Sequence, residues 1–566
     1  MDDGTTVQTS CGILQGQVEG QVRVFRGVPF ACPPIGERRF KSPTPFQWTG
    51  VRKATCAGPA APQANSKNMD RIRQLICSLD REGVPGIIAG PPYVFNTYDH
   101  DDISEDCLYL DLWAPLKTQS RKKYPVYLYY HGGANIVSSG SFLPERGHNL
   151  ACQEDIIVVR PNYRLGALGW VHFGLISNSV KDAINLGIQD QIAALKWTHV
   201  NIEAFGGDPD NITVGGESAG GTAVSHLLVN PDAQKLVRRA IAQSLSPFNV
   251  WATQQSPEAA VVARKYLDML QIEDPAQLME VDVEKLLAVH NILLRLFPAD
   301  ANLAWCPSGG VVDGLIVPEN PALCLSVKPY PRKDFELMVG FAKDEWQFFR
   351  GHSPTLMAGT RSDVLAVLAQ VFGDEQAEAL LDSYQEMHVD HDHRQLLNDI
   401  MSMEFFKLSS ICIGLNLADQ GIPTYLFQFA IDLPRAGGAI HTGDMPFIWR
   451  NFTTRDLQRW PAFEGFDVEL FPPVSASFGS MYGSFIRNGT PGNHEDWPPF
   501  EGRFETILSF GTHLEARPGL LQGECKAFKM AGISGFPALH ERLLLNVQRG
   551  IRERITGSLP REVVTK

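Results

Sequence analysis

The pentapeptide Gly216-Glu217-Ser218-Ala219-Gly220 constrains the fold of this chain more than any other feature. A short β-branched run, Ile212–Val214, leads into it, and a helical stretch, Ala219–Leu228, leads out of it. A Gly-x-Ser-x-Gly sequence between a strand and a helix predicts a sharp turn that raises the serine hydroxyl above the end of a sheet. The flanking glycines let strand and helix approach each other without Cβ clashes. Ser218 is therefore the candidate nucleophile.

Further short apolar runs along the chain predict the other strands of that sheet. They are Val126–Tyr130, Ile156–Val159, Glu336–Val339 and Tyr425–Phe429. Helical stretches such as Asp190–Val200 and Glu258–Leu270 alternate with them, which predicts an α/β fold with a mostly parallel central sheet flanked by helices. No repeat, low-complexity block or Gly/Ser linker interrupts the sequence, so we expect a single domain over residues 1–566. Two helical segments, roughly 258–302 and 363–419, are expected to be large insertions that cap the sheet.

A glycine-rich loop follows the predicted strand Val126–Tyr130 directly, with the sequence His131-Gly132-Gly133-Ala134. Acyl transfer requires backbone N–H groups aimed at a tetrahedral oxyanion, and such a loop can present several of them. The candidate oxyanion donors are Gly133, Ala134 and Ala219. His131 is expected to pack and orient the loop rather than to titrate in catalysis.

An acid and a histidine should follow the serine in that order, each on a loop after a strand. Strand Glu336–Val339 leads to two adjacent carboxylates, Asp344 and Glu345, between which the strand order does not choose. Strand Tyr425–Phe429 leads to the loop that holds His441. His441 is the candidate general base, and the carboxylate would fix its tautomer and stabilise the imidazolium.

Composition limits the remaining possibilities. A formal net charge of −13 argues against nucleic acid as a partner, and no uninterrupted apolar run is long enough to span a membrane. The N-terminus resembles no signal peptide, so a cytoplasmic location is expected.

We expect no cofactor and no metal. The histidines between His388 and His393 are typical of a solvated loop, and the ten cysteines show no spacing of a metal site. Most cysteines should be reduced and buried, although Cys56, Cys77 and Cys107 are close enough in sequence for one disulfide.

Together these motifs make the chain similar to the type-B carboxylesterases, the carboxylesterase/cholinesterase branch of the α/β-hydrolases. The segments that carry the resemblance are Phe25–Ala31, Ser104–Leu110 and Asn201–Gly220. The resemblance implies Glu345 as the triad acid, His441 as the base, and two scaffold ion pairs, Arg39–Glu105 and Arg164–Asp190. It also shows departures. Alanine stands at the third oxyanion position, as in microbial-looking members, and Trp346 replaces the usual glycine after the acid. The family's first disulfide would join Cys107 to a position near Ala61, where no cysteine stands, and both cysteines of its second disulfide are missing.

The resulting expectation is a serine hydrolase that cleaves a hydrophobic or aromatic carboxylic ester through an acyl-enzyme. Two alternatives stay open: an acyltransferase or dedicated biosynthetic esterase with the same triad, and, more remotely, a non-catalytic binding relative. A small-molecule ester is the only partner implied, and the oligomeric state is open. Aromatic residues near the catalytic segments are candidate pocket residues: Trp251, Trp346, Phe348, Phe349 and Phe447.

Overall fold

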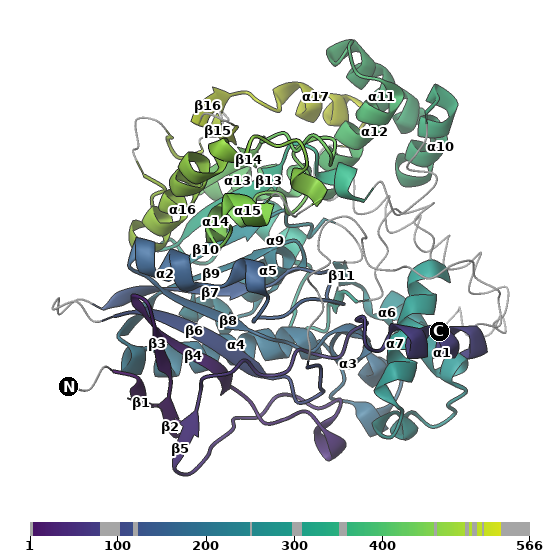
Figure 1. Cartoon of the computed structure of the whole chain (residues 1–566). Coiled ribbons are helices and arrows are strands. Elements are labelled where there is room, and N and C mark those ends of the chain that lie inside the picture. Colours follow the sequence, from purple (N-terminus) through teal and green to yellow (C-terminus); the bar gives the residue numbers. More distant parts are fainter. Residues whose placement is uncertain are drawn as a thin grey trace.

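A computed structural model of the chain describes most of its residues (Figure 1). The described ranges are 4–79, 102–116, 123–248, 252–296, 308–349, 359–457, 461–492, 497–500, 506–511 and 514–533. Through these ranges runs an 11-stranded sheet with the strand order β16-β15-β14-β13-β10-β9-β7-β8-β6-β4-β3.

The centre of the sheet is parallel. All neighbouring pairs from β15 to β8 run in the same direction. These strands are β15 (Thr506–Phe510), β14 (Thr424–Phe429), β13 (Glu336–Ala342), β10 (Arg239–Gln243), β9 (Gly207–Glu217), β7 (Tyr124–Tyr130) and β8 (Ile157–Pro161). The five predicted strands all lie among them, and β9 extends well beyond the predicted Ile212–Val214.

Antiparallel strands close both edges of the sheet. At one edge lies β16, and at the other β6, β4 and β3 follow in turn. Their bounds are Leu514–Pro518, Tyr109–Pro115, Val22–Pro29 and Gln17–Glu19. The prediction of a mostly parallel α/β-hydrolase sheet is therefore confirmed. The sheet as a whole is mixed, because the strands at its two edges are antiparallel. A small separate sheet, β1 (Thr6–Gln8), β2 (Ile13–Gln15) and β5 (Val51–Lys53), lies near the N-terminus.

Helices cover both faces of the sheet, which explains why its strands read as continuously apolar. On one face α4 (Leu186–Asn201) and α5 (Ala219–Val229) share a core with β7, β9 and β10. On the other face α2 (His148–Glu154), α14 (Met445–Trp449) and α16 (Phe471–Asn488) form a second core, rich in aromatic side chains.

Both predicted insertions are helical where they are described. The first holds α6 (Ser256–Leu270) and α7 (Val283–Leu296), and α6 begins at Ser256 with Gln255 as its N-cap, two residues before the predicted start at Glu258. The second holds a longer series, whose first three helices stand together at one end of the molecule and whose last helix packs against β13 and β14 (Figure 1). Its members are α10 (Arg361–Phe372), α11 (Asp374–Met387), α12 (His393–Ser402), the π-helix η11 (Met403–Lys407) and α13 (Leu408–Asp419).

The continuous helical stretch His393–Asp419 is long and apolar enough to cross a membrane by length and composition. Within this structure 83% of its most apolar window is buried against the rest of the chain. This degree of burial is typical of a core helix, whose apolar surface is covered by other parts of the same protein.

The two scaffold ion pairs implied by the resemblance are present. Arg164 and Asp190 lie 2.7 Å apart with almost no exposure, and Arg39 pairs with Glu105.

Each of the nine cysteines in the described ranges is free, so the possible disulfide among Cys56, Cys77 and Cys107 does not form. The expectation that most cysteines are buried is wrong: of the nine, Cys107 alone is fully buried, because most of the others lie in loops or on partly exposed helix faces.

Candidate active site

Ser218 occupies the turn between β9 and α5. Its backbone angles, φ 58° and ψ −121°, lie in a strained region that residues with a side chain rarely adopt. The turn is possible because glycines lie where strand and helix touch: a Cβ on Gly220 would lie 2.0 Å from the Tyr130 carbonyl oxygen. The Ser218 N–H donates to the carbonyl of Gln243 (3.0 Å), which ties the turn to the neighbouring strand β10. The sequence motif thus forms the predicted strand-to-helix elbow.

His441 and Glu345 are brought together from loops after two neighbouring strands, β14 and β13. His441 Nδ1 lies 2.5 Å from Glu345 Oε2, and both side chains are almost completely buried. The other carboxylate oxygen of Glu345 accepts hydrogen bonds from Ser244 Oγ and from the N–H of Ala342, each at 2.7 Å. This network holds the carboxylate in one orientation.

The geometry also separates the two adjacent carboxylates. Asp344 points away from His441 and accepts a hydrogen bond from the N–H of Ala439 (2.9 Å), so that it holds the loop rather than the imidazole. Ser244, by contrast, donates a hydrogen bond directly to Glu345. No sequence signal marks Ser244, because its role comes from pairing of β10 with β13.

His441 faces the elbow with its second nitrogen. His441 Nε2 lies 3.3 Å from Glu217 Oε1, and Glu217 directly precedes Ser218 in the chain. Burial raises the pKa of Glu217, but the positive charge of protonated His441 opposes that rise, so the two groups favour each other's charged forms. Burial alone would lower the pKa of His441, but the negative charges of Glu217 and Glu345 outweigh it and raise that pKa to about 9. Glu217 belongs to the pentapeptide, yet the sequence reasoning assigned it no role.

The glycine-rich loop lies against the same elbow. A Cβ on Gly132 would lie 2.7 Å from the Glu217 carboxylate and 3.2 Å from the Ser218 Cβ, so only glycine fits there. Gly133 and Ala134 both have positive φ, 98° and 53°, and Ala134 is exposed. His131 stacks on Tyr163 with ring centroids 4.4 Å apart, and the Tyr163 hydroxyl donates to the His131 carbonyl (2.7 Å). His131 therefore packs and orients the loop, as expected.

Aromatic rings enclose His441. The ring centroids of Phe348, Phe349 and Phe406 lie 5.5, 5.3 and 4.8 Å from the imidazole centroid. Two of these were predicted, but Phe406 was not. It lies on η11, and π-helical turns are frequent at functional sites. Trp346 packs beneath this group on Phe405 (4.6 Å) and is only 2% exposed, so it supports the wall from the core side.

Two predicted pocket residues do not join this group. Phe447 is completely buried in the core that includes α2, α14 and α16, where it packs against Phe429, Phe463 and Phe471. Its prediction as a pocket residue is wrong, because α14 turns its apolar side chains into the second core. Trp251 lies outside the described residues.

Two histidines of the histidine-rich loop each face a single carboxylate, and they do not form a cluster of ligands. His391 Nδ1 lies 2.8 Å from Asp399, and His388 lies 3.7 Å from Glu524. A search of the described ranges finds no group of three or more His, Cys, Asp or Glu side chains that could hold a metal ion.

Beside His441, the buried Asp444 accepts a hydrogen bond from Gln243 (2.7 Å), and burial raises the pKa of Asp444 to about 6.

Comparison with known proteins agrees with this geometry. Residues 3–528 match the model of the carboxylesterase family. The para-nitrobenzyl esterase of Bacillus subtilis is 30% identical over 89% of this chain and 94% of its own length, and the phenmedipham hydrolase of Pseudarthrobacter oxydans is 29% identical over the same shares. Among solved structures, a carboxylesterase of Geobacillus stearothermophilus matches with a TM-score of 0.76 and 29% identity, covering 92% of this chain and 99% of that one. The chain therefore belongs to the carboxylesterase family and is a carboxylic-ester hydrolase.

Proposed function

We propose that this hydrolase works through an acyl-enzyme on Ser218, with His441 as general base and Glu345 as the orienting acid. The observation that carries the proposal is the 2.5 Å contact between His441 Nδ1 and Glu345 Oε2 beside the strained turn at Ser218. Glu345 fixes the proton on Nδ1, which leaves Nε2 to accept the proton of the serine hydroxyl. The serine oxygen then attacks the ester carbonyl, and His441 returns the proton to the leaving alcohol. Water repeats the sequence on the acyl-enzyme and releases the acid.

The oxyanion of each tetrahedral intermediate would be held by the N–H groups of Gly133, Ala134 and Ala219. Ala219 begins α5, where the helix dipole adds to the stabilisation of negative charge. Loss of one such donor typically costs a factor of about 10²–10³ in kcat.

The substrate class we propose is an ester with an aromatic or apolar group beside the scissile bond. Phe348, Phe349 and Phe406 supply aromatic surface next to the imidazole. The names of two relatives, para-nitrobenzyl esterase and phenmedipham hydrolase, refer to aromatic compounds. Steady-state kinetics on para-nitrophenyl esters should show higher kcat/KM for butyrate and benzoate than for acetate. Equal values for all three would refute this specificity.

The mechanism is tested by covalent labelling with an organophosphate, followed by intact-mass and peptide mass spectrometry. We expect one adduct per chain, located on Ser218, and loss of esterase activity in proportion to labelling. Ser218→Ala should take no label and lose activity by several orders of magnitude. A label at another serine, or activity in Ser218→Ala close to that of the unmodified protein, would contradict the proposal.

We also propose a reducing compartment such as the cytoplasm as its location. The free state of the described cysteines supports it, because extracellular proteins of this size commonly use disulfides. Fluorescence microscopy of the tagged protein in its native host tests this location.

A further inference from the structure

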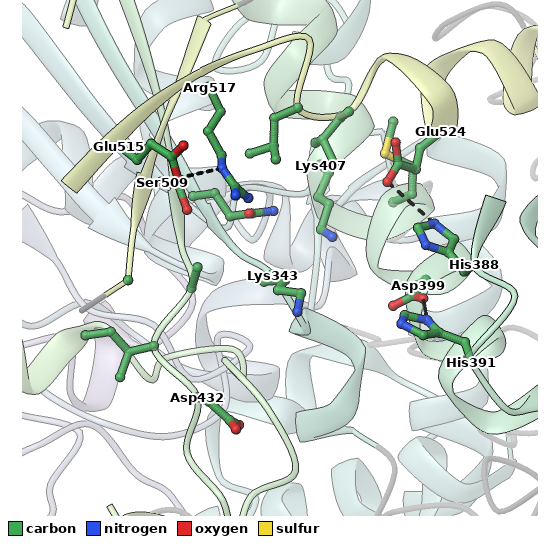
Figure 2. A pocket seen from close by; sticks show the side chains of 17 residues that line it. Lys343, His388, His391, Asp399, Lys407, Asp432, Ser509, Glu515, Arg517 and Glu524 are labelled. Carbon is green, nitrogen blue, oxygen red and sulfur yellow. Dashed lines mark hydrogen bonds and ion pairs between the residues drawn. The ribbon is translucent and has the colours of Figure 1, made fainter. Parts of the chain in front are cut away.

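A recess of about 620 Å³ opens at the carboxyl ends of β13, β14 and β15, beside α12 and α17 (Gln522–Met530) (Figure 2). Neither Ser218, His441 nor Glu345 lines it. The carboxyl end of parallel strands is where α/β proteins bind ligands, and the volume suits a small organic molecule. The proposed ester hydrolysis gives this recess no role.

Its floor carries three polar side chains from three different elements. Lys407, Gln428 and Ser509 are 6%, 4% and 7% exposed. Gln428 and Ser509 are direct partners in the register of β14 and β15, so their side chains lie next to each other on one face of the sheet. Lys407 enters from η11, and Figure 2 shows it directed into the same space.

These three side chains make no hydrogen bond or ion pair with any other residue in the described part of the chain. The Lys407 ammonium interacts electrostatically with the Asp344 carboxylate, whose pKa burial raises and this charge lowers. A buried ammonium that donates no hydrogen bond still costs free energy that folding must offset. Ammonium, amide and hydroxyl groups can all donate hydrogen bonds, and together they match the two oxygens of a carboxylate.

Several other charged or titratable side chains around the recess face a partner. Arg517 lies 2.9 Å from Glu515, His391 lies 2.8 Å from Asp399, and His388 lies 3.7 Å from Glu524. Two charged residues remain without an ion pair in the described ranges besides Lys407: Lys343, which is exposed and directed inward, and Asp432, which is exposed at the rim (Figure 2). Among the residues that line the recess, Lys407 is therefore the buried ammonium group.

Apolar side chains form the rest of the inner wall. Met403, Ile431, Leu520 and Leu521 line the recess, and Met403, Ile431 and Leu521 are almost completely buried. An inorganic anion would leave this surface in contact with water, whereas an organic anion would cover it.

We propose that this recess is a binding site for a small carboxylate with an apolar body, whose head group is held by Lys407, Gln428 and Ser509. The site is separate from the catalytic centre but shares η11 with it: Met403 and Lys407 line the recess, while Phe406 on the same turn contacts His441. A bound carboxylate thus stabilises the turn that supports the aromatic wall of the active site.

The test is isothermal titration of the full-length protein with phenylbutyrate. We expect saturable binding that Lys407→Met weakens at least tenfold and that Ser509→Ala weakens by a smaller factor. Lys529→Met, which removes an exposed charge from α17, is the matched control and leaves the dissociation constant unchanged. Lys407→Met should fold and unfold at an equal or higher temperature, because it removes a buried ammonium group that donates no hydrogen bond in the described ranges.

Two further ligands separate the parts of the proposal. Phenylbutyramide has the same body without the charge and should bind at least tenfold more weakly. Inorganic phosphate has charge without the body and should also bind at least tenfold more weakly. Equal binding of phenylbutyrate to Lys407→Met and to the unmodified protein would overturn the proposal, as would equal binding of the amide or of phosphate.

Discussion

At the scale of single residues, His441 lies between two carboxylates, Glu345 on Nδ1 and Glu217 beside Nε2. The base must be neutral to accept the serine proton, so activity should rise as pH passes the pKa of His441, which these carboxylates raise to about 9. Removing one negative charge lowers that pKa. We therefore predict that Glu217→Gln moves the rising limb of kcat/KM to lower pH, by about one unit.

The measurement is kcat/KM on one ester from about pH 6 to about pH 10, fitted for the ascending limb. Glu37→Gln, an exposed carboxylate far from the site in sequence, provides the control and should leave the limb in place. A limb that stays unchanged in Glu217→Gln would show that this carboxylate does not control the ionisation of the base.

Gly132 gives a second prediction at this scale. A Cβ there would lie 2.7 Å from the Glu217 carboxylate and 2.9 Å from its carbonyl oxygen, a distance that real Cβ atoms essentially never show. Gly132→Ala should displace the glycine-rich loop and lower kcat by a factor of about 10² or more, as loss of an oxyanion donor does. Gly359→Ala is the control, because the nearest atom to its added Cβ belongs to the flexible Arg394 side chain. Near-normal kcat in Gly132→Ala would contradict this reading of the loop.

At the scale of elements, one buried ion pair joins α4 to the loop after β8. Asp190 on α4 accepts hydrogen bonds from the N–H of Arg164 (3.0 Å) and from its guanidinium (2.8 and 2.7 Å). Asp190→Ala would leave the buried guanidinium without a counterion, which costs about 3–5 kcal/mol. We predict a marked fall in the unfolding midpoint, measured by scanning calorimetry.

The matched variant is Asp232→Ala, which breaks an exposed pair with Lys196 (3.6 Å). Exposed pairs contribute about 1 kcal/mol or less, so its midpoint should stay near that of the unmodified protein. Similar midpoints for both variants would mean that the buried pair does not hold α4 in place.

Comparing elements also shows what the sequence could predict. The parallel strands and α5 were predictable because each is marked by a local sequence pattern. The strands are short apolar runs, and the helix has clear signals at its ends. Strand order predicted an acid and then a histidine after the serine, but it left Asp344 and Glu345 open, and the resemblance to the family implied Glu345. Phe406 was missed and Phe447 misplaced, because the face on which an aromatic residue lies is decided by tertiary packing. The π-turn that carries Phe406 has no local sequence signature, and Ser244 meets Glu345 only through pairing of β10 with β13.

At the scale of the whole molecule, the two cores and the helical insertions hold the structure together without covalent crosslinks in the described ranges. A disulfide stabilises mainly by restricting the unfolded chain, and none of the nine described cysteines takes part in one. We therefore predict that a reductant leaves the unfolding midpoint unchanged. The measurement compares freshly purified protein with and without dithiothreitol, with thiol titration under denaturing conditions as the control. A midpoint that falls on reduction would show a crosslink that stabilises the fold.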